Sequence, residues 1–171
     1  MKEAELLKSK VSKDSMTGAG SRAFGSTLLH EYLNNFKKIG NNYSLAILDI
    51  DNFKHINDRY GHNVGDSAIK SLVNTIKSLQ NENDHIIRWG GDEFILVYNS
   101  LLDDLEEKLE IINQKVSEQE IETETGEKIH YTISIGASSF NEKDEEISDT
   151  IKRVDDALYL AKRKKNTYYV I

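Results

Sequence analysis

Arg-Trp-Gly-Gly-Asp-Glu-Phe, residues 88–94, decides how the middle of this chain folds. Its two glycines are flanked by apolar runs at residues 85–87 and 94–98, a pattern that predicts a β-hairpin with a tight turn. Glycine adopts positive φ and lets a ligand approach the backbone closely. The adjacent carboxylates of Asp92 and Glu93 repel each other unless a proton or cation lies between them. The stretch therefore predicts a turn that holds a divalent cation beside an anionic substrate.

A second acidic group follows an apolar run at residues 44–48, which is typical of a strand buried on both faces. The run ends in Asp49-Ile50-Asp51. Because side chains alternate along a strand, Asp49 and Asp51 are expected on the same side of the sheet. If this strand lies beside the hairpin, Asp49 and Asp92 can bind the same ion. Hard oxygen ligands, without cysteine and with few histidines nearby, favour Mg²⁺ or Mn²⁺ over zinc.

The composition limits the classes of protein to which the chain can belong. Its 171 residues are enough for one domain with a hydrophobic core. The formal net charge of -7 argues against a general nucleic-acid or membrane-surface binder. The absence of cysteine excludes disulfides and thiolate sites, and no run resembles a transmembrane helix or a signal-peptide core. A soluble cytoplasmic protein without nucleic-acid or membrane contact is therefore expected.

Hydrophobic periodicity predicts strands that alternate with amphipathic helices. Predicted helices cover residues 2–12, 22–38, 66–80, 101–118 and 155–165, and further strands cover residues 131–138 and 168–171. Gly126 and the acidic residues 142–146 are expected in surface loops. Strands that alternate with helices predict an α/β fold in which helices cover a central sheet.

Several motifs in the expected order resemble the GGDEF-domain diguanylate cyclase family over residues 14–171. They are Asp-Ser-Met-Thr-Gly at 14–18, Asp-Ile-Asp-Asn-Phe-Lys-His-Ile-Asn-Asp at 49–58, Gly-His-Asn-Val-Gly-Asp at 61–66, Gly-Gly-Asp-Glu-Phe at 90–94, Ser-Ile-Gly at 134–136 and Asp-Asp-Ala-Leu-Tyr-Leu-Ala-Lys at 155–162. The resemblance implies an α/β (α+β) fold with a palm-like, ferredoxin-type central antiparallel sheet of about five strands, flanked by helices, whose hairpin bears the Gly-Gly-Asp-Glu-Phe turn. It also implies that residues 14–171 are the GGDEF catalytic domain and that residues 1–13 are an N-terminal connecting helix.

The resemblance further implies that the chain condenses two GTP molecules into cyclic di-GMP and two pyrophosphates. Each subunit would bind one GTP, so two half-sites would face each other in a homodimer during catalysis. Mg²⁺, or Mn²⁺, would be held by Asp49, the Ile50 carbonyl and Asp92, in a two-metal arrangement that activates the 3′-hydroxyl and stabilises pyrophosphate. Asp49, Asp92 and Glu93 would form the catalytic group. Two roles for Glu93 stay open: second metal ligand, or acid–base residue near the attacking hydroxyl.

Four residues are implicated in binding the triphosphate. Asn52, Phe53 and Lys54 could form an ordinary turn with a solvated lysine. The resemblance instead makes their backbone N–H groups a phosphate cradle, with Lys54 as a point charge on the phosphates. Lys162 lies in a basic cluster that would also be favourable to a helix dipole, and the resemblance implies that it contacts the triphosphate.

Asn57 and Asp66 lie near predicted helix ends, where asparagine and aspartate are common caps. The resemblance implies instead that they read the guanine base. A carboxylate accepts from the N1–H and exocyclic amine of guanine, an amide donates to a guanine acceptor, and adenine lacks that donor pair. The related subgroup that makes adenine-containing dinucleotides carries serine at the position of Asp66, so the aspartate favours GTP.

Some features depart from the family pattern. Residues 81–84 read Asn-Glu-Asn-Asp, where many members carry an Arg-x-x-Asp product-inhibition motif. An amide cannot replace the contacts of that arginine, so weak or no product inhibition through this site is expected. The usual Gly-Arg-Asn ending is missing after Lys162, and either Lys165 or Asn166 takes the arginine position.

Two alternatives to an active diguanylate cyclase stay open. One is a catalytically silent GTP-binding signalling module, and the other is a cyclase that makes mixed or adenine cyclic dinucleotides. An upstream sensory domain absent from this chain is a further expected partner.

Overall fold

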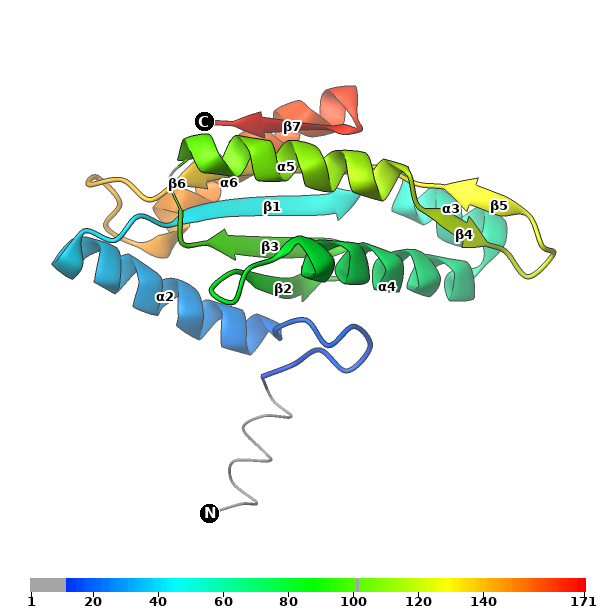
Figure 1. Cartoon of the computed structure of the whole chain (residues 1–171), viewed down its shortest axis with the longest axis horizontal. Helices are drawn as coiled ribbons and strands as arrows, with labels where there is room; N and C mark the ends of the chain where they lie inside the picture. The colour runs from blue at the N-terminus through cyan, green and yellow to red at the C-terminus, as the bar shows by residue number, and fades with distance from the viewer. Residues whose placement is uncertain (1–11, 101) are drawn as a thin grey trace, which may run out of the picture.

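The fold is built on a five-stranded sheet with helices on both faces (Figure 1), and the computed structural model describes residues 12–100 and 102–171. The helices are α2 (Arg22–Ile39), α3 (Phe53–Tyr60), α4 (His62–Leu79), α5 (Leu102–Ser117) and α6 (Ile147–Lys164). The strands are β1 (Ser44–Ile50), β2 (His85–Gly90), β3 (Glu93–Tyr98), β4 (Glu120–Glu122), β5 (Lys128–His130), β6 (Ile133–Ser139) and β7 (Thr167–Val170). The predicted fold class is confirmed.

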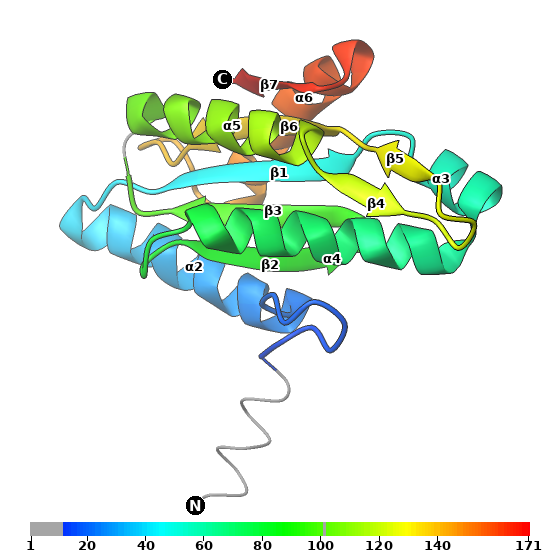
Figure 2. The same cartoon turned by 45° about the vertical axis from the view of Figure 1, so that its right-hand side comes forward.

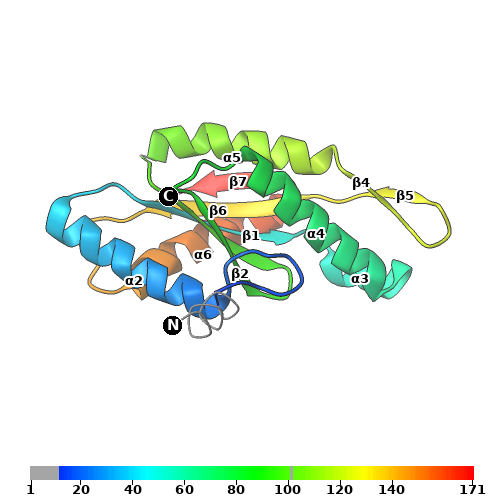
Figure 3. The ribbon, with the colours of Figure 1, turned by 60° about the horizontal axis from the view of Figure 1, so that its bottom comes forward.

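The main sheet has the strand order β2-β3-β1-β6-β7, and β4 and β5 pair as a separate two-stranded sheet. All neighbours in the main sheet are antiparallel except β6 and β7, which are parallel. Figure 3 shows α4 and α5 on one side of the sheet and α2 and α6 on the other. The chain therefore forms two hydrophobic cores, one on each face.

Strand β1 lies at the centre of the sheet and is buried on both faces, as its apolar run predicts. Leu48 belongs to the core that contains residues of α4 and α5. Ile47 belongs to the other core, together with Leu29 of α2 and Leu158 of α6. Because side chains alternate along the strand, Asp49 lies on the same side as Ile47, the side covered by α6.

Helix α6 lies directly against β6. A Cβ atom on Gly136 would be 2.1 Å from the backbone nitrogen of Leu158 and 2.4 Å from the carbonyl oxygen of Val154. Only glycine permits this close approach of helix and strand. The same helix carries Lys162 to the end of β1.

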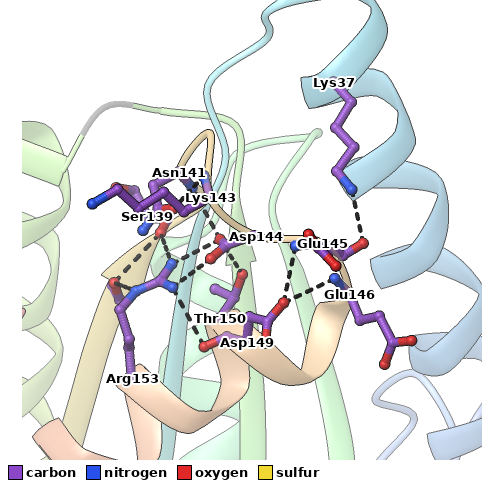
Figure 4. A network of polar contacts seen from close by, with 11 residues as sticks. Lys37, Ser139, Asn141, Lys143, Asp144, Glu145, Glu146, Asp149, Thr150 and Arg153 are labelled. Carbon is purple, nitrogen blue, oxygen red and sulfur yellow. Dashed lines mark hydrogen bonds and ion pairs between the residues drawn. The ribbon is translucent and has the colours of Figure 1, made fainter.

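Helix α6 begins at Ile147, and not at residue 155 as predicted. A network of polar contacts surrounds this helix start (Figure 4). Asp144 is buried and accepts hydrogen bonds from Arg153 Nη2 (2.8 Å) and Thr150 Oγ1 (2.7 Å). Asp149 accepts from two backbone N–H groups that precede the helix (2.9 and 3.0 Å). The helix start is thus stabilised by polar contacts, which leave little apolar periodicity in the sequence.

Helix α3 and the β4–β5 hairpin were not predicted, and α4 begins at His62 rather than at residue 66. Ile56 is the buried residue of α3, so helical periodicity there is weak. Gly61, with φ 90°, separates α3 from α4. Strands β4 and β5 have three residues each, one buried between two exposed, and such segments are too short for a periodic signal. The helices predicted at 22–38 and 101–118, and the strands predicted at 131–138 and 168–171, agree with the structure within two residues.

The chain reaches the sheet alongside the edge strand β2 (Figure 2). The Gly20 N–H donates to the Ile86 carbonyl (2.8 Å), and the Arg88 N–H donates to the Gly20 carbonyl (2.9 Å). The first two described residues form a turn and a β-bridge. Residues 12 and 13 are therefore not helical, and the rest of the helix predicted over residues 1–13 lies outside the described part of the chain. Among the described helices, none has the length and apolar character needed to cross a membrane.

Candidate active site

The hairpin predicted from residues 88–94 is present as β2, a two-residue turn and β3. Gly90 pairs with Glu93 across the hairpin, and Gly91 and Asp92 form the turn. Gly91 has φ +43°, in the left-handed region that favours glycine. A Cβ atom on either glycine would meet no described atom within 4 Å. The turn therefore faces open space, where a ligand can approach its backbone.

The tertiary structure brings three of the predicted carboxylates together at this end of the sheet. Asp49 on β1 is directly opposite Glu93 on β3. Burial raises the pKa of the Asp92 carboxyl, and its own backbone, Lys162 and the nearby backbone of Ile50 offset this only in part. Lys162 on α6 forms an ion pair with Asp49. The group combines side chains from the strand, the hairpin and the helix.

Burial is the main electrostatic influence on these carboxylates. It raises the pKa of Asp49, and the hydrogen bond and charge of Lys162 offset this only in part. It also raises the pKa of Glu93, to which the charge of Asp155 adds. Burial would lower the pKa of Lys162, but Asp49 and the neighbouring carboxylates raise it overall. Several carboxylates thus share one ammonium group, and the excess negative charge favours binding of a cation.

The donor atoms fit a hard divalent cation. Asp49 supplies a carboxylate from β1, and Asp92 supplies one from the turn that precedes the adjacent strand β3. Within residues 12–100 and 102–171, no group of three or more His, Cys, Asp or Glu side chains is arranged as a complete metal site. Mg²⁺ in nucleotide enzymes is usually bound by one or two carboxylates together with substrate phosphates and water. The residues present therefore fit an ion that binds together with a nucleotide.

Asp51 belongs to the framework of the site. It is 8% exposed and accepts hydrogen bonds from Thr132 Oγ1 (2.7 Å), Ser134 Oγ (2.6 Å) and the Asn166 N–H (2.9 Å). Ser134 is the cross-strand partner of Asp49, so Asp51 lies on the same side of the sheet as Asp49, as predicted. These bonds hold the loop after β1 against β6 and the end of α6.

The start of α3 provides free backbone N–H groups at the predicted phosphate cradle. Asn52 is the N-cap residue, with φ 56°, and its side chain makes no capping hydrogen bond. Phe53 and Lys54 begin the helix, whose first turn contains no acidic residue. The N–H groups of a first helical turn lack intrahelical acceptors and carry positive partial charge. Lys165 Nζ donates to Asn52 Oδ1 (2.6 Å), which places a basic side chain beside the first turn of α3.

Neither Asn57 nor Asp66 is a helix cap. Helix α4 begins at His62 with Gly61 as its N-cap, so Asp66 lies in the second turn with an exposed side chain. Asn57 lies within α3, and its buried Oδ1 has no hydrogen-bond partner among the described residues. A Cβ atom on Gly65 would be 1.9 Å from that Oδ1. Because Oδ1 points inward against Gly65, Nδ2 is the end of the amide left for a ligand.

The sequence did not point to Asp155, and it pointed to Lys165 only as one of two alternatives. The charge of Asp155 on α6 adds to burial in raising the pKa of Glu93, and Lys165 lies beside Asn52 at the start of α3. The spacing of seven residues between Asp155 and Lys162 was an available signal, because residues i and i+7 share a helix face. The side chain of Lys165 contacts Asn52, whereas the Asn166 N–H donates to Asp51.

Residues 81–84 form a turn before β2. The Asp84 side chain is 4% exposed and accepts from the Asn81 N–H (3.0 Å) and from Lys108 Nζ (3.5 Å). Its carboxylate is therefore engaged within the protein, and the neighbouring Asn81 provides no guanidinium group.

Comparisons with known proteins identify the family. The model described as "Diguanylate cyclase, GGDEF domain" matches residues 11–167. Diguanylate cyclase DgcM of Escherichia coli (strain K12) is 36% identical over 159 residues, which are 92% of this chain and 38% of that protein, so the chain spans well under half the length of this relative. The diguanylate cyclase SiaD of Pseudomonas aeruginosa, crystallised with its activator SiaC, is 30% identical with a TM-score of 0.91, over 100% of this chain and 66% of that one. The GGDEF domain of DgcB from Caulobacter crescentus, in complex with c-di-GMP, is 27% identical with a TM-score of 0.89, over 93% of this chain and 92% of that one. This chain belongs to the GGDEF-domain family of diguanylate cyclases.

Proposed function

We propose that this chain condenses two GTP molecules into cyclic di-GMP and releases two pyrophosphates. The observation that carries the proposal is the group of carboxylates at the open hairpin turn, where Asp49 is opposite Glu93 and pairs with Lys162. Curated relatives that bear the name diguanylate cyclase, and a related GGDEF domain in complex with c-di-GMP, support it.

Asp49, Asp92 and the Ile50 carbonyl would hold Mg²⁺, or Mn²⁺, in this site. When bound, the ion would polarise the α-phosphate and stabilise the negative charge on the attacking and departing oxygens. Lys162 would exchange its contact with Asp49 for one with the triphosphate, because the ion would then neutralise that carboxylate. Glu93 would either add a ligand or accept the proton of the attacking 3′-hydroxyl.

The nucleotide would lie along α3. The N–H groups at Asn52, Phe53 and Lys54 would bind the phosphates with the Lys54 charge nearby, in the manner of anion sites at helix N-termini. Asn57 would donate from Nδ2 to the guanine, and Asp66 would accept from its N1–H and exocyclic amine. Adenine would be disfavoured because it lacks that donor pair.

Each site would hold one GTP, so catalysis would need two copies of the chain with their sites facing each other. We assign residues 14–171 to the catalytic domain and residues 1–13 to a segment that connects it to an upstream sensory domain. We also propose that cyclic di-GMP does not inhibit through residues 81–84, because Asp84 is already paired with Lys108. Tight cyclic di-GMP binding that Asp84→Ala abolishes would contradict this.

The decisive experiment incubates the protein at high concentration with GTP and Mg²⁺ and identifies the products by mass, with Asp92→Ala as the control. Cyclic di-GMP from the unmodified protein alone would support the proposal. GTP binding without product, even after forced dimerisation, would favour a catalytically silent signalling module. Competition between GTP and ATP would reveal a cyclase that makes mixed or adenine dinucleotides.

A further inference from the structure

Arg88 joins two turns that are far apart in the sequence. Its Nε and Nη2 donate to the Gly91 carbonyl (2.9 and 2.8 Å). Its Nη1 donates to both carboxylate oxygens of Asp14 (3.3 Å each). A guanidinium group presents its donors in a fixed plane. The positions of the Gly91 carbonyl and the Asp14 carboxylate are therefore linked through one rigid side-chain group.

Asp14 is firmly held at the other end of this link. Its Oδ1 accepts from the Thr17 N–H (2.9 Å) and the Thr17 hydroxyl (2.7 Å), and its carbonyl accepts from the Gly18 N–H (2.8 Å). Burial would raise the pKa of Asp14, but the hydrogen bonds from Thr17 and the charge of Arg88 lower it overall. Asp14 thus anchors Arg88 to the turn at residues 14–18, which we call the N-terminal turn.

The Gly91 carbonyl has a particular significance for the active site. It belongs to the peptide group that joins Gly91 to Asp92, so its orientation sets the plane from which the Asp92 side chain departs. The β2–β3 register shifts between Arg88 and Gly90, so the regular strand pairing is interrupted just where Arg88 contacts the turn. Arg88 thus constrains the orientation of the turn formed by Gly91 and Asp92, which we call the catalytic turn.

From this geometry we propose that Arg88 is a positioning residue that couples the N-terminal turn to the catalytic turn, so that the arrangement of residues 14–18 sets the orientation of Asp92 and Glu93. The inference rests on the proposed cyclase function. If the coupling holds, a displacement of the chain that precedes the N-terminal turn would change the orientation of the Asp92 and Glu93 carboxylates. This displacement would be transmitted through two side chains, Asp14 and Arg88, without a movement of the sheet.

Three substitutions separate the parts of this link. Asp14→Asn keeps an oxygen that can accept from Thr17 but removes the charge that holds Arg88. Arg88→Lys keeps the charge but cannot place two donors on the Gly91 carbonyl. Arg88→Gln removes the charge and the fork together. Arg22→Ala is the matched control, because Arg22 also contacts β2, through the Trp89 ring at 4.8 Å, but does not hold the turn carbonyl.

The first measurement is hydrogen–deuterium exchange at the backbone amides of residues 90–93, which requires no activity. We expect faster exchange in all three variants and unchanged exchange in Arg22→Ala. The second is steady-state kinetics at a protein concentration that saturates activity. Because misplacement of a catalytic group by about 1 Å can cost on the order of 10²-fold, kcat should fall by about 10- to 100-fold. KM for GTP should change less than about threefold, because the proposed base and phosphate contacts are elsewhere.

The double variant Asp14→Asn/Arg88→Gln tests the coupling itself. If the two residues act in one link, the double variant loses little more activity than Arg88→Gln alone. Independent, multiplicative losses would overturn the coupling. Unchanged exchange and unchanged kcat in Arg88→Lys and Asp14→Asn, with only a lower melting temperature, would show a merely structural ion pair and overturn the proposal. Product formation by the unmodified protein tests the cyclase function separately, and the exchange data still decide the coupling if no product forms.

Discussion

Gly65→Ala should weaken GTP binding although the new methyl group lies on the side of Asn57 that faces the protein. A Cβ atom at this position would lie 1.9 Å from Asn57 Oδ1 and 2.9 Å from its Cγ. Both distances are too short for non-bonded atoms, so the Asn57 amide must swing away. Nδ2 would then leave the place from which we expect it to donate to guanine.

The effect of Gly65→Ala on the free energy of unfolding is the sum of two opposing contributions. Alanine in place of glycine within a helix favours folding by about 1 kcal/mol, and displacement of a short side chain offsets part of that gain. The free energy of unfolding should therefore change by less than about 1 kcal/mol. A hydrogen bond between neutral groups contributes about 1 kcal/mol to binding, so its loss should raise the dissociation constant for GTP about fivefold.

Titration calorimetry with a non-hydrolysable GTP analogue, on the single variants and on Asn57→Ala/Gly65→Ala, tests this reasoning. Once Asn57 is truncated, Gly65→Ala should cost no further affinity. Ser67→Ala, also on α4, is the control for a new alanine that displaces nothing. The reasoning fails if Gly65→Ala leaves the affinity unchanged, or if it weakens binding equally with and without the Asn57 side chain.

Three further outcomes are expected. Gly136→Ala should destabilise the fold by about 3 kcal/mol or more, because its Cβ would meet the backbone of α6 at 2.1 Å; a urea midpoint equal to that of the unmodified protein would contradict the close packing. Asp144→Asn should cost about 2 kcal/mol at neutral pH by leaving Arg153 without its charged partner. Although burial would raise the pKa of Asp144, hydrogen bonds from Arg153, the Asn141 backbone and Thr150 lower it overall, so this stabilisation is present at neutral pH and is lost as the pH falls through the lowered pKa. The difference in urea stability between the two proteins should therefore shrink below about pH 4, and a constant difference would refute the assignment. Lys165→Ala should raise KM for GTP about fivefold by removing an exposed charge beside the phosphate cradle, whereas the exposed neighbour Lys164→Ala should have little effect; equal effects would indicate general electrostatics.

Local patterns in the sequence were sufficient for most elements and for the class of chemistry. The apolar run before Asp49 is long enough to predict a strand buried on both faces, and both faces of β1 are indeed covered by helices. The glycines before Asp92 predict a tight turn, and Gly91 does adopt the positive φ that such a turn requires. The short helix α3 was missed because it buries only Ile56 and so has little apolar periodicity. The start of α6 was missed because polar contacts of Asp144 and Asp149, and not apolar spacing, stabilise it.

The sequence by itself determined which residue types are available: adjacent carboxylates on a glycine turn, aspartates after a buried strand, and a lysine seven residues after Asp155. Only the tertiary structure decided which of them meet. Asp49 lies opposite Glu93 because β3 is the antiparallel neighbour of β1, and Lys162 reaches Asp49 because Gly136 lets α6 lie against β6. Strand order and helix approach depend on the packing of the whole chain, and periodicity within one segment carries no information about partners that lie far away in the sequence.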